Sequence, residues 1–216
     1  MPSFQQQRET LERWLRFPAL ERLEAGVALT FDDGPDPDGT PAVLEALAVA
    51  VARAVFFLVG EQVEAHPDLA RRVADEGHAV ALHGFRHVEH DELGAAVRAD
   101  LERGAAATSA ATGVEPRLYR PPYGRFTEES YRAVSELGLE PVYWSAWGGD
   151  WEPIPAERIA ELAIRDLVPG AILLLHDSAR YATRPSAAPT AAALPAILAE
   201  MRDRGLEPVT VPAGPA

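Results

Sequence analysis

Short apolar runs alternate with longer amphipathic segments along most of the chain. The apolar runs are bounded by Gly, Pro and polar residues, which is typical of buried strands. They fall at residues 26–29, 54–59, 78–82, 117–120, 140–144, 171–175 and 208–211. The segments between them predict helices over residues 41–51, 63–76, 91–112, 128–137, 156–167 and 190–204. Seven strands alternating with helices predict an α/β fold whose parallel sheet forms a barrel or near-barrel.

The first 25 residues have a different pattern from the rest. Leu11, Trp14, Leu15 and Leu20 recur at roughly helical spacing with charges between them. This spacing predicts an N-terminal helical extension over residues 1–25, ahead of one α/β domain. No uninterrupted apolar stretch typical of a secretion signal occurs there. We therefore expect a cytoplasmic protein from the sequence as written, or an extracytoplasmic one if a leader segment has been removed.

The composition narrows the classes of partner and of metal site. With 33 acidic and 20 basic residues the net charge is −13, which disfavours nucleic acid and anionic membranes as partners. Neutral or cationic substrates are easier to accommodate. There is no cysteine, so any metal must be held by His, Asp or Glu. No apolar run approaches the roughly 20 residues of a membrane span. The oligomeric state is not set by any of these features.

Unusual polar side chains follow the strands at their carboxyl ends. They are Asp32, Asp33, His83, His87, Arg120, Asp150 and His176. In barrels of this kind, the loops after the carboxyl ends of the strands build the functional site. We therefore expect these side chains to converge at one rim.

The histidines at this rim suggest a metal site. His83 and His87 are four residues apart, which lets both imidazoles reach one ion. A carboxylate of the Asp32-Asp33 pair is the natural third ligand, while the other carboxylate stays free to handle a proton. Two histidines and one carboxylate leave a position open for water, as in catalytic zinc sites. Of the competing ligands, His78 is expected at the opposite rim and His90 in solvent.

Three further features at the rim suggest acid–base chemistry on a sugar. His176 ends a buried strand and could serve as a general acid. Arg120 could pair with Asp32 and hold it ionised. Trp144, Trp147 and Trp151 crowd one loop, where they either pack in the core or stack on a sugar ring.

Five short motifs, in order, resemble those of the polysaccharide deacetylase family, also called the NodB-homology domain or carbohydrate esterase family 4. The matching segments are residues 30–35 (TFDDGP), 83–87 (HGFRH), 120–124 (RPPYG), 150–151 (DW) and 173–176 (LLLH). The resemblance covers about residues 26–211, and it implies a NodB-like catalytic domain over residues 26–213 with a deformed (β/α)7 barrel.

The resemblance also implies roles for individual residues. Asp33, His83 and His87 would bind a divalent metal, most often zinc, with cobalt or nickel as alternatives. The catalytic residues would be Asp32 as the base that activates water, His176 as the acid, Arg120 orienting Asp32, and Asp150 orienting His176. The backbone N–H of Tyr123 would stabilise the oxyanion, and Trp151 and Leu174 would line the acetyl pocket.

Two positions depart from the family pattern. Gly84 stands where the second motif has Ser or Thr, and Trp147 where the fourth motif opens with Asp. Gly84 is expected to loosen the metal loop modestly, and Trp147 to affect substrate binding.

Three functions are therefore open. The first is metal-dependent deacetylation of an N-acetylated, or less favourably O-acetylated, sugar such as a chitin oligomer or peptidoglycan. The second is hydrolysis of a non-sugar C–N bond of the cyclic ureide type, and the third is glycan binding without catalysis.

Overall fold

The computed structural model describes residues 17–212. Its strands are β1 (Val27–Asp32), β2 (Val55–Leu58), β3 (Ala79–Leu82), β4 (Leu118–Tyr119), β5 (Glu140–Pro141), β6 (Ala146–Trp147), β7 (Ala171–His176) and β8 (Pro208–Val209). Its α-helices are α2 (Thr40–Val49), α3 (Gly60–Ala65), α4 (Pro67–Asp75), α5 (His90–Leu93), α6 (Val97–Thr112), α7 (Glu128–Glu136), α8 (Ala156–Arg165) and α9 (Ala188–Asp203). Two 3₁₀ turns, η1 (Gly94–Ala96) and η2 (Pro122–Gly124), complete the description.

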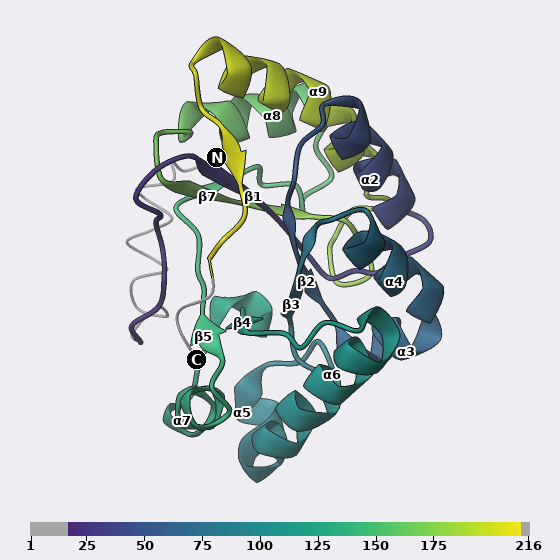
Figure 1. Ribbon diagram of the computed structural model, residues 1–216, viewed down its shortest axis with the longest axis vertical. Helices are drawn as coiled ribbons and strands as arrows, with labels where there is room; N and C mark the ends of the chain where they lie inside the picture. Colours follow the sequence, from purple (N-terminus) through teal and green to yellow (C-terminus); the bar gives the residue numbers. More distant parts are fainter. Residues whose placement is uncertain (1–16, 213–216) are drawn as a thin grey trace.

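All strand pairs in the sheet are parallel. The order is β5-β4-β3-β2-β1-β7-β6, and β8 pairs with β1 beside this path. Strands β5 and β6 lie at opposite ends of the order, yet only residues 142–145 separate them in the chain. The chain itself therefore closes the curled sheet, and helices cover its outside (Figure 1). This confirms the predicted deformed (β/α)7 barrel.

Alternate residues of the central strands face two different cores. Leu29, Phe31 and Leu173 pack into the cluster formed with the covering helices α2, α8 and α9. Ala28 and Leu174 belong to the second cluster, which fills the barrel interior with aromatic side chains. Because position 32 shares the face of position 28, and position 176 that of 174, the strand ends aim Asp32 and His176 into the interior.

Several element boundaries differ from the prediction. The predicted helix 63–76 is two helices, because residues that precede proline avoid the helical region and Pro67 follows His66. The predicted helix 91–112 breaks at η1, where Gly94 has a φ of 48°. The predicted fifth strand 140–144 is regular only at β5, and the chain pairs again at β6.

Most of the predicted N-terminal helical extension lies outside the described residues. Residues 17–25 carry no helix, and two isolated bridges, Leu20 to Val142 and Arg22 to Ala171, fix this segment to the barrel. Among residues 17–212, no helix has the length and apolar character that crossing a membrane requires.

The aromatic pair Phe31 and Phe56 gives a direct test of the outer core. Their fully buried rings stack with centroids 5.1 Å apart. Phe56→Ala is expected to lower the free energy of unfolding by about 3–5 kcal/mol, because it leaves a cavity in a packed core. Val49→Ala, at a side chain that is 89% exposed, is the control and should change it by less than about 0.5 kcal/mol. Urea unfolding measures both, and a loss below about 1 kcal/mol for Phe56→Ala would contradict this packing.

Candidate active site

Two carboxyl-terminal strand ends place a carboxylate and an imidazole side by side. Strands β1 and β7 pair in register over six residues, and the last pair is Asp32 with His176. Both side chains line the same cavity. The sequence predicts that both lie at one rim of the barrel, and the strand register makes them direct neighbours.

Asp33 is turned away from the direction that an extended strand would give it. Its φ is 82°, in the left-handed region that non-glycine residues seldom adopt. The chain then passes Asp177 so closely that a Cβ on Gly34 would lie 2.2 Å from Asp177 Oδ2. Only glycine fits there, and the resulting bend brings the Asp33 carboxylate to the histidines.

Asp33, His83 and His87 form a compact, buried set of metal-ligand groups. Asp33 Oδ1 lies 3.5 Å from His83 Nε2 and 3.2 Å from His87 Nε2. One ligand atom from each residue lies within 4.8 Å of the other two. His83 Nδ1 lies 2.6 Å from the carbonyl oxygen of Arg120, so Nδ1–H donates there and Nε2 is left free to bind a cation. The donor types and their convergence fit a divalent metal.

The charge on Asp33 is stabilised within this set. Burial raises its pKa, but the adjacent imidazoles of His83 and His87, with the charges of His87 and His176, hold that pKa well below its ordinary value. Asp33 is therefore an ionised ligand at neutral pH.

Arg120 fixes the second carboxylate, Asp32. The guanidinium Nη1 donates to Asp32 Oδ1 at 2.6 Å and to Thr30 Oγ1 at 2.9 Å. Nε and Nη2 donate to the carbonyl oxygens of Val142 and Tyr143. Arg120 is fully buried, so this pair is shielded from solvent. The predicted pairing of Arg120 with Asp32 is thus present in the structure.

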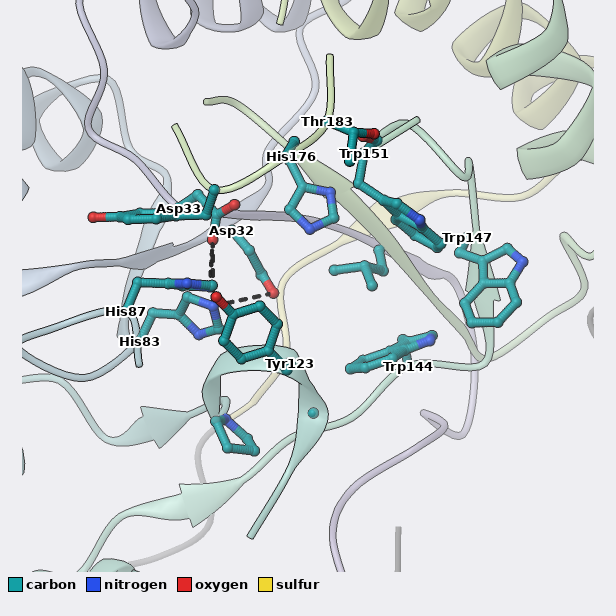
Figure 2. Close-up of a pocket in the computed structure, with 15 residues that line it drawn as sticks. Asp32, Asp33, His83, His87, Tyr123, Trp144, Trp147, Trp151, His176 and Thr183 are labelled. Carbon is teal, nitrogen blue, oxygen red and sulfur yellow. Dashed lines mark hydrogen bonds and ion pairs between the residues drawn. The ribbon is translucent and has the colours of Figure 1, made fainter. Parts of the chain in front are cut away.

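Asp150 fixes both the ring and the backbone of His176. Asp150 Oδ1 lies 2.9 Å from His176 Nδ1, and Oδ2 accepts the backbone N–H of His176 at 2.8 Å. Burial lowers the pKa of His176, but the charge of Asp150 and the hydrogen bond to it, with the charges of Asp33 and Asp32, raise it to about 9. His176 is therefore protonated at neutral pH, with Nε2 facing the cavity (Figure 2).

These groups surround a cavity of about 300 Å³. One side carries Asp32, Asp33, His83, His87 and His176, and the other is apolar (Figure 2). The apolar side includes Pro121, Trp144, Trp147, Trp151 and Leu174. Of the ten predicted site residues, eight line the cavity, and Arg120 and Asp150 lie behind Asp32 and His176.

The tryptophans and Tyr123 shape the rim. Trp151 packs edge-on against Trp147 at 5.5 Å and against His176 at 5.9 Å between centroids. Tyr123 has a φ of 57° and packs edge-on against His87. Half of the Tyr123 side chain is exposed at the mouth, where it can meet a ligand.

Tyr181 is a site residue that the sequence analysis missed. Its ring stacks on His87 with centroids 4.1 Å apart and planes 11° apart. Its hydroxyl donates to Glu61 Oε1 at 2.7 Å and accepts from Gln62 Nε2 at 3.1 Å. Residues 181–189, which are rich in Ala, Ser and Pro, are typical of a surface excursion, and their lack of periodicity gave no signal that Tyr181 lines the site.

Asp100 on α6 holds the loop that carries the two histidines. Its Oδ2 accepts the backbone N–H of Phe85 at 2.8 Å, and its Oδ1 accepts Nε–H of Arg86 at 3.1 Å. Gly84 has a φ of 84°, and a Cβ there would lie 3.2 Å from the carbonyl oxygen of Arg86. The carboxylate of Asp100 anchors the loop beside Gly84, with Oδ2 3.4 Å from the place where a Cβ on Gly84 would lie.

One expectation about the other histidines was wrong. His90 is buried, not exposed: its Nε2 lies 2.7 Å from the hydroxyl of Tyr119, and burial lowers its pKa to about 4. It lies at the start of α5, where its ring packs against Tyr119 and Phe126. His78 precedes β3 and accepts the N–H of Ala54, so it lies at the opposite rim as predicted.

The fold is a curled parallel barrel, and its site combines a buried set of potential metal ligands with an arginine-held carboxylate and a carboxylate-held imidazole. The family model for polysaccharide deacetylase matches residues 20–142, and the chain belongs to this family. It is 32% identical over 194 residues to a peptidoglycan-N-acetylglucosamine deacetylase of Bacillus cereus, covering 88% of this chain and 68% of the relative. It is 38% identical over 160 residues to a chitooligosaccharide deacetylase of Bradyrhizobium, covering 70% of each chain.

A solved structure agrees with the sequence relatives. The family 4 carbohydrate esterase from Streptomyces lividans, solved in complex with acetate, superposes with a TM-score of 0.79 at 31% identity, over 88% of this chain and 94% of that one. The family predicted from the five motifs is thus confirmed, and so is the class of hydrolase.

Asp100 gives a test of the metal loop that does not depend on turnover. Asp100→Ala leaves the N–H of Phe85 without its acceptor, and we expect zinc affinity to fall about 10–100-fold, as for other groups that orient metal ligands. Glu102→Ala, an exposed carboxylate on the same helix, is the matched control. Calorimetric titration of zinc into metal-stripped protein measures both, and equal affinities would show that Asp100 does not support the site.

Proposed function

We propose that this protein is a metal-dependent hydrolase that removes the acetyl group from an N-acetylated sugar or polysaccharide, such as a chitin oligomer or peptidoglycan. The observation that carries the proposal is the placement of Asp32 and His176 side by side in one cavity, next to the ligand triad. One buried carboxylate is held by a cation and one buried imidazole by an anion. Such different environments let one group act as the base and the other as the acid at the same pH.

Asp33, His83 and His87 would hold the metal. When bound, a divalent cation supplies Lewis-acid polarisation of the acetyl carbonyl and lowers the pKa of water. Two imidazole nitrogens and one carboxylate suit zinc, and the same nitrogen and oxygen ligands accept cobalt or nickel. Zinc is the metal we favour.

Asp32 acts as the general base in this proposal. Arg120 occupies its Oδ1, so Oδ2 is the oxygen that remains for a proton from the attacking water. Oδ2 also lies 3.9 Å from His83 Nε2, at the edge of the triad. The base therefore lies where water beside the triad can be deprotonated.

His176 acts as the general acid. Its Nδ1 is bound to Asp150, so Nε2 delivers the proton to the nitrogen of the leaving amine. The C–N bond then breaks, and the products are acetate and a free amino group. The backbone N–H of Tyr123, at the cavity mouth, would stabilise the negative oxygen of the tetrahedral intermediate.

The apolar side of the cavity suits the acetyl group and a sugar ring. Trp151 and Leu174 lie beside His176 and would enclose the acetyl methyl group. The curated relatives act, by their names, on N-acetylglucosamine in peptidoglycan and on chitooligosaccharides, which supports the same sugar here. Trp147, at the position where the family motif has Asp, adds an aromatic face to this side.

The test is acetate release from N-acetylglucosamine oligomers, peptidoglycan fragments and acetylated xylan. The protein is stripped with a chelator and then reloaded with zinc, cobalt or nickel. Release from an N-acetylated glycan that disappears on stripping and returns with metal is the expected result. Turnover of cyclic ureides with no acetate release from any glycan would favour the non-sugar C–N hydrolase, and tight glycan binding with no turnover would favour an inactive relative.

Replacing the base provides the first mutational prediction. Asp32→Asn should lower kcat by on the order of 10²–10⁴-fold, because the amide cannot accept the proton. Zinc should still bind, since Asp33, His83 and His87 remain. Asp38→Asn, an exposed carboxylate a few residues along, should keep full activity. Full activity of Asp32→Asn on the same substrate would exclude Asp32 as the base.

The pH dependence of kcat tests the acid role of His176. The acid must be protonated, so kcat should fall as pH rises through the pKa of His176. A bound cation offsets the charge of Asp33, so we expect this limb between the ordinary value of about 6.5 and about 9. Asp150→Asn removes an anion that raises this pKa and should shift the limb to lower pH by on the order of one unit. Superimposable pH profiles would refute the role of Asp150.

A further inference from the structure

A buried arginine lies behind the acid half of the site. Arg184 comes from the irregular segment between β7 and α9, and only 2% of its side chain is exposed. Burying a guanidinium is costly unless its hydrogen bonds and its charge are matched. The hydrogen-bond and ion-pair partners of Arg184 therefore indicate the role of its buried charge.

All of the contacts of its two terminal nitrogens converge on the acid. Nη2 donates to the carbonyl oxygen of His176 at 2.9 Å and to that of Ser178 at 3.0 Å. Nη1 donates to Thr190 Oγ1 and lies 3.5 Å from Asp150 Oδ2. The guanidinium thus contacts the backbone of His176 and the carboxylate that holds its ring.

Thr190 completes the set from the first turn of α9. Its hydroxyl is fully buried and donates to Asp150 Oδ2 at 2.7 Å. Oδ2 therefore meets the backbone N–H of His176, the hydroxyl of Thr190 and the charge of Arg184, while Oδ1 is left for the imidazole. Every contact of this carboxylate favours its ionised form and one orientation.

We infer that Arg184 and Thr190 are positioning residues for the acid step: they fix Asp150 and the backbone of His176 so that Nε2 points at the leaving nitrogen. Neither residue lines the cavity, so they act through Asp150 and His176. Burial raises the pKa of Asp150, but the charge of His176 and the hydrogen bond to it, together with the charge of Arg184 and the hydrogen bond from Thr190, lower it. The inference rests on the proposed acid role of His176.

The choice of substrate separates this role from general damage. Cleavage of an amide needs a proton on the leaving nitrogen, whereas 4-nitrophenyl acetate releases a stable anion and does not need the acid. Arg184→Met should therefore lower kcat on an N-acetylglucosamine oligomer by on the order of 10–100-fold. Its kcat on the ester should change by less than about twofold, and KM and zinc affinity should stay the same.

Matched variants complete the design. Arg180→Met, on the same segment but 42% exposed, should behave as the unmodified protein. Arg184→Lys keeps the positive charge but loses the planar, forked set of N–H donors of the guanidinium. It should therefore recover part of the amide activity. If Arg184→Met does not fold, Arg184→Lys and Thr190→Val serve instead, and each should lower amide turnover selectively. In an Asp150→Asn background, Arg184→Met should add less than about a further twofold loss, because both act on one step.

The outcomes are distinguishable. Equal losses on amide and ester, or no loss on either, in a folded variant would overturn the inference. His176→Gln is the reference: if it leaves the amide-to-ester ratio unchanged, the proposed acid role itself is wrong. If His176→Gln lowers the ratio while Arg184→Met and Thr190→Val do not, only the positioning role is wrong.

Discussion

Arg120 crosses the interior of the barrel and joins Asp32 on β1 to the backbone of residues 142 and 143, which close the sheet. Its guanidinium also lies over the ring of Phe57, 4.1 Å from the centroid. A charge in this position is tolerated only because each side of it meets a carboxylate, a carbonyl or an aromatic face. Removing one partner of such a buried pair typically costs about 3–5 kcal/mol. The contact that orients Asp32 therefore also helps to hold the barrel closed.

Each half of the site pairs a buried ionisable side chain with a buried partner of opposite charge. On one side the cation of Arg120 holds the carboxylate of Asp32 through a 2.6 Å hydrogen bond to Oδ1. On the other, the anion of Asp150 keeps an imidazole protonated and directed at the cavity. Between them, Asp33 and the two histidines present three converging ligand atoms. The parallel register of β1 and β7 brings the halves together, since it places residues 32 and 176 opposite each other.

Much of this arrangement could be predicted from the sequence because strand ends are local features. Asp32, His83 and His176 each follow an apolar run, and parallel strands bring such positions to one rim. Tyr181 and Arg184 could not be found in this way, because they lie in an irregular segment whose path depends on tertiary contacts with α3, β7 and α9. The prediction that His90 lies in solvent was wrong for a related reason: its burial against Tyr119 depends on a tertiary contact between the start of α5 and β4. Strand β5 was predicted too long because the residues after it bend to close the sheet.

The central claim is that the metal binds to Asp33, His83 and His87 while Asp32 remains free as the base. An anomalous difference map, collected at the zinc edge from crystals of the zinc-loaded protein, tests this most directly. One strong peak is expected, liganded by Asp33 and by Nε2 of both histidines, with Asp32 still bound to Arg120 and not to the metal. A zinc ion liganded by Asp32, or no zinc at these three residues, would contradict it.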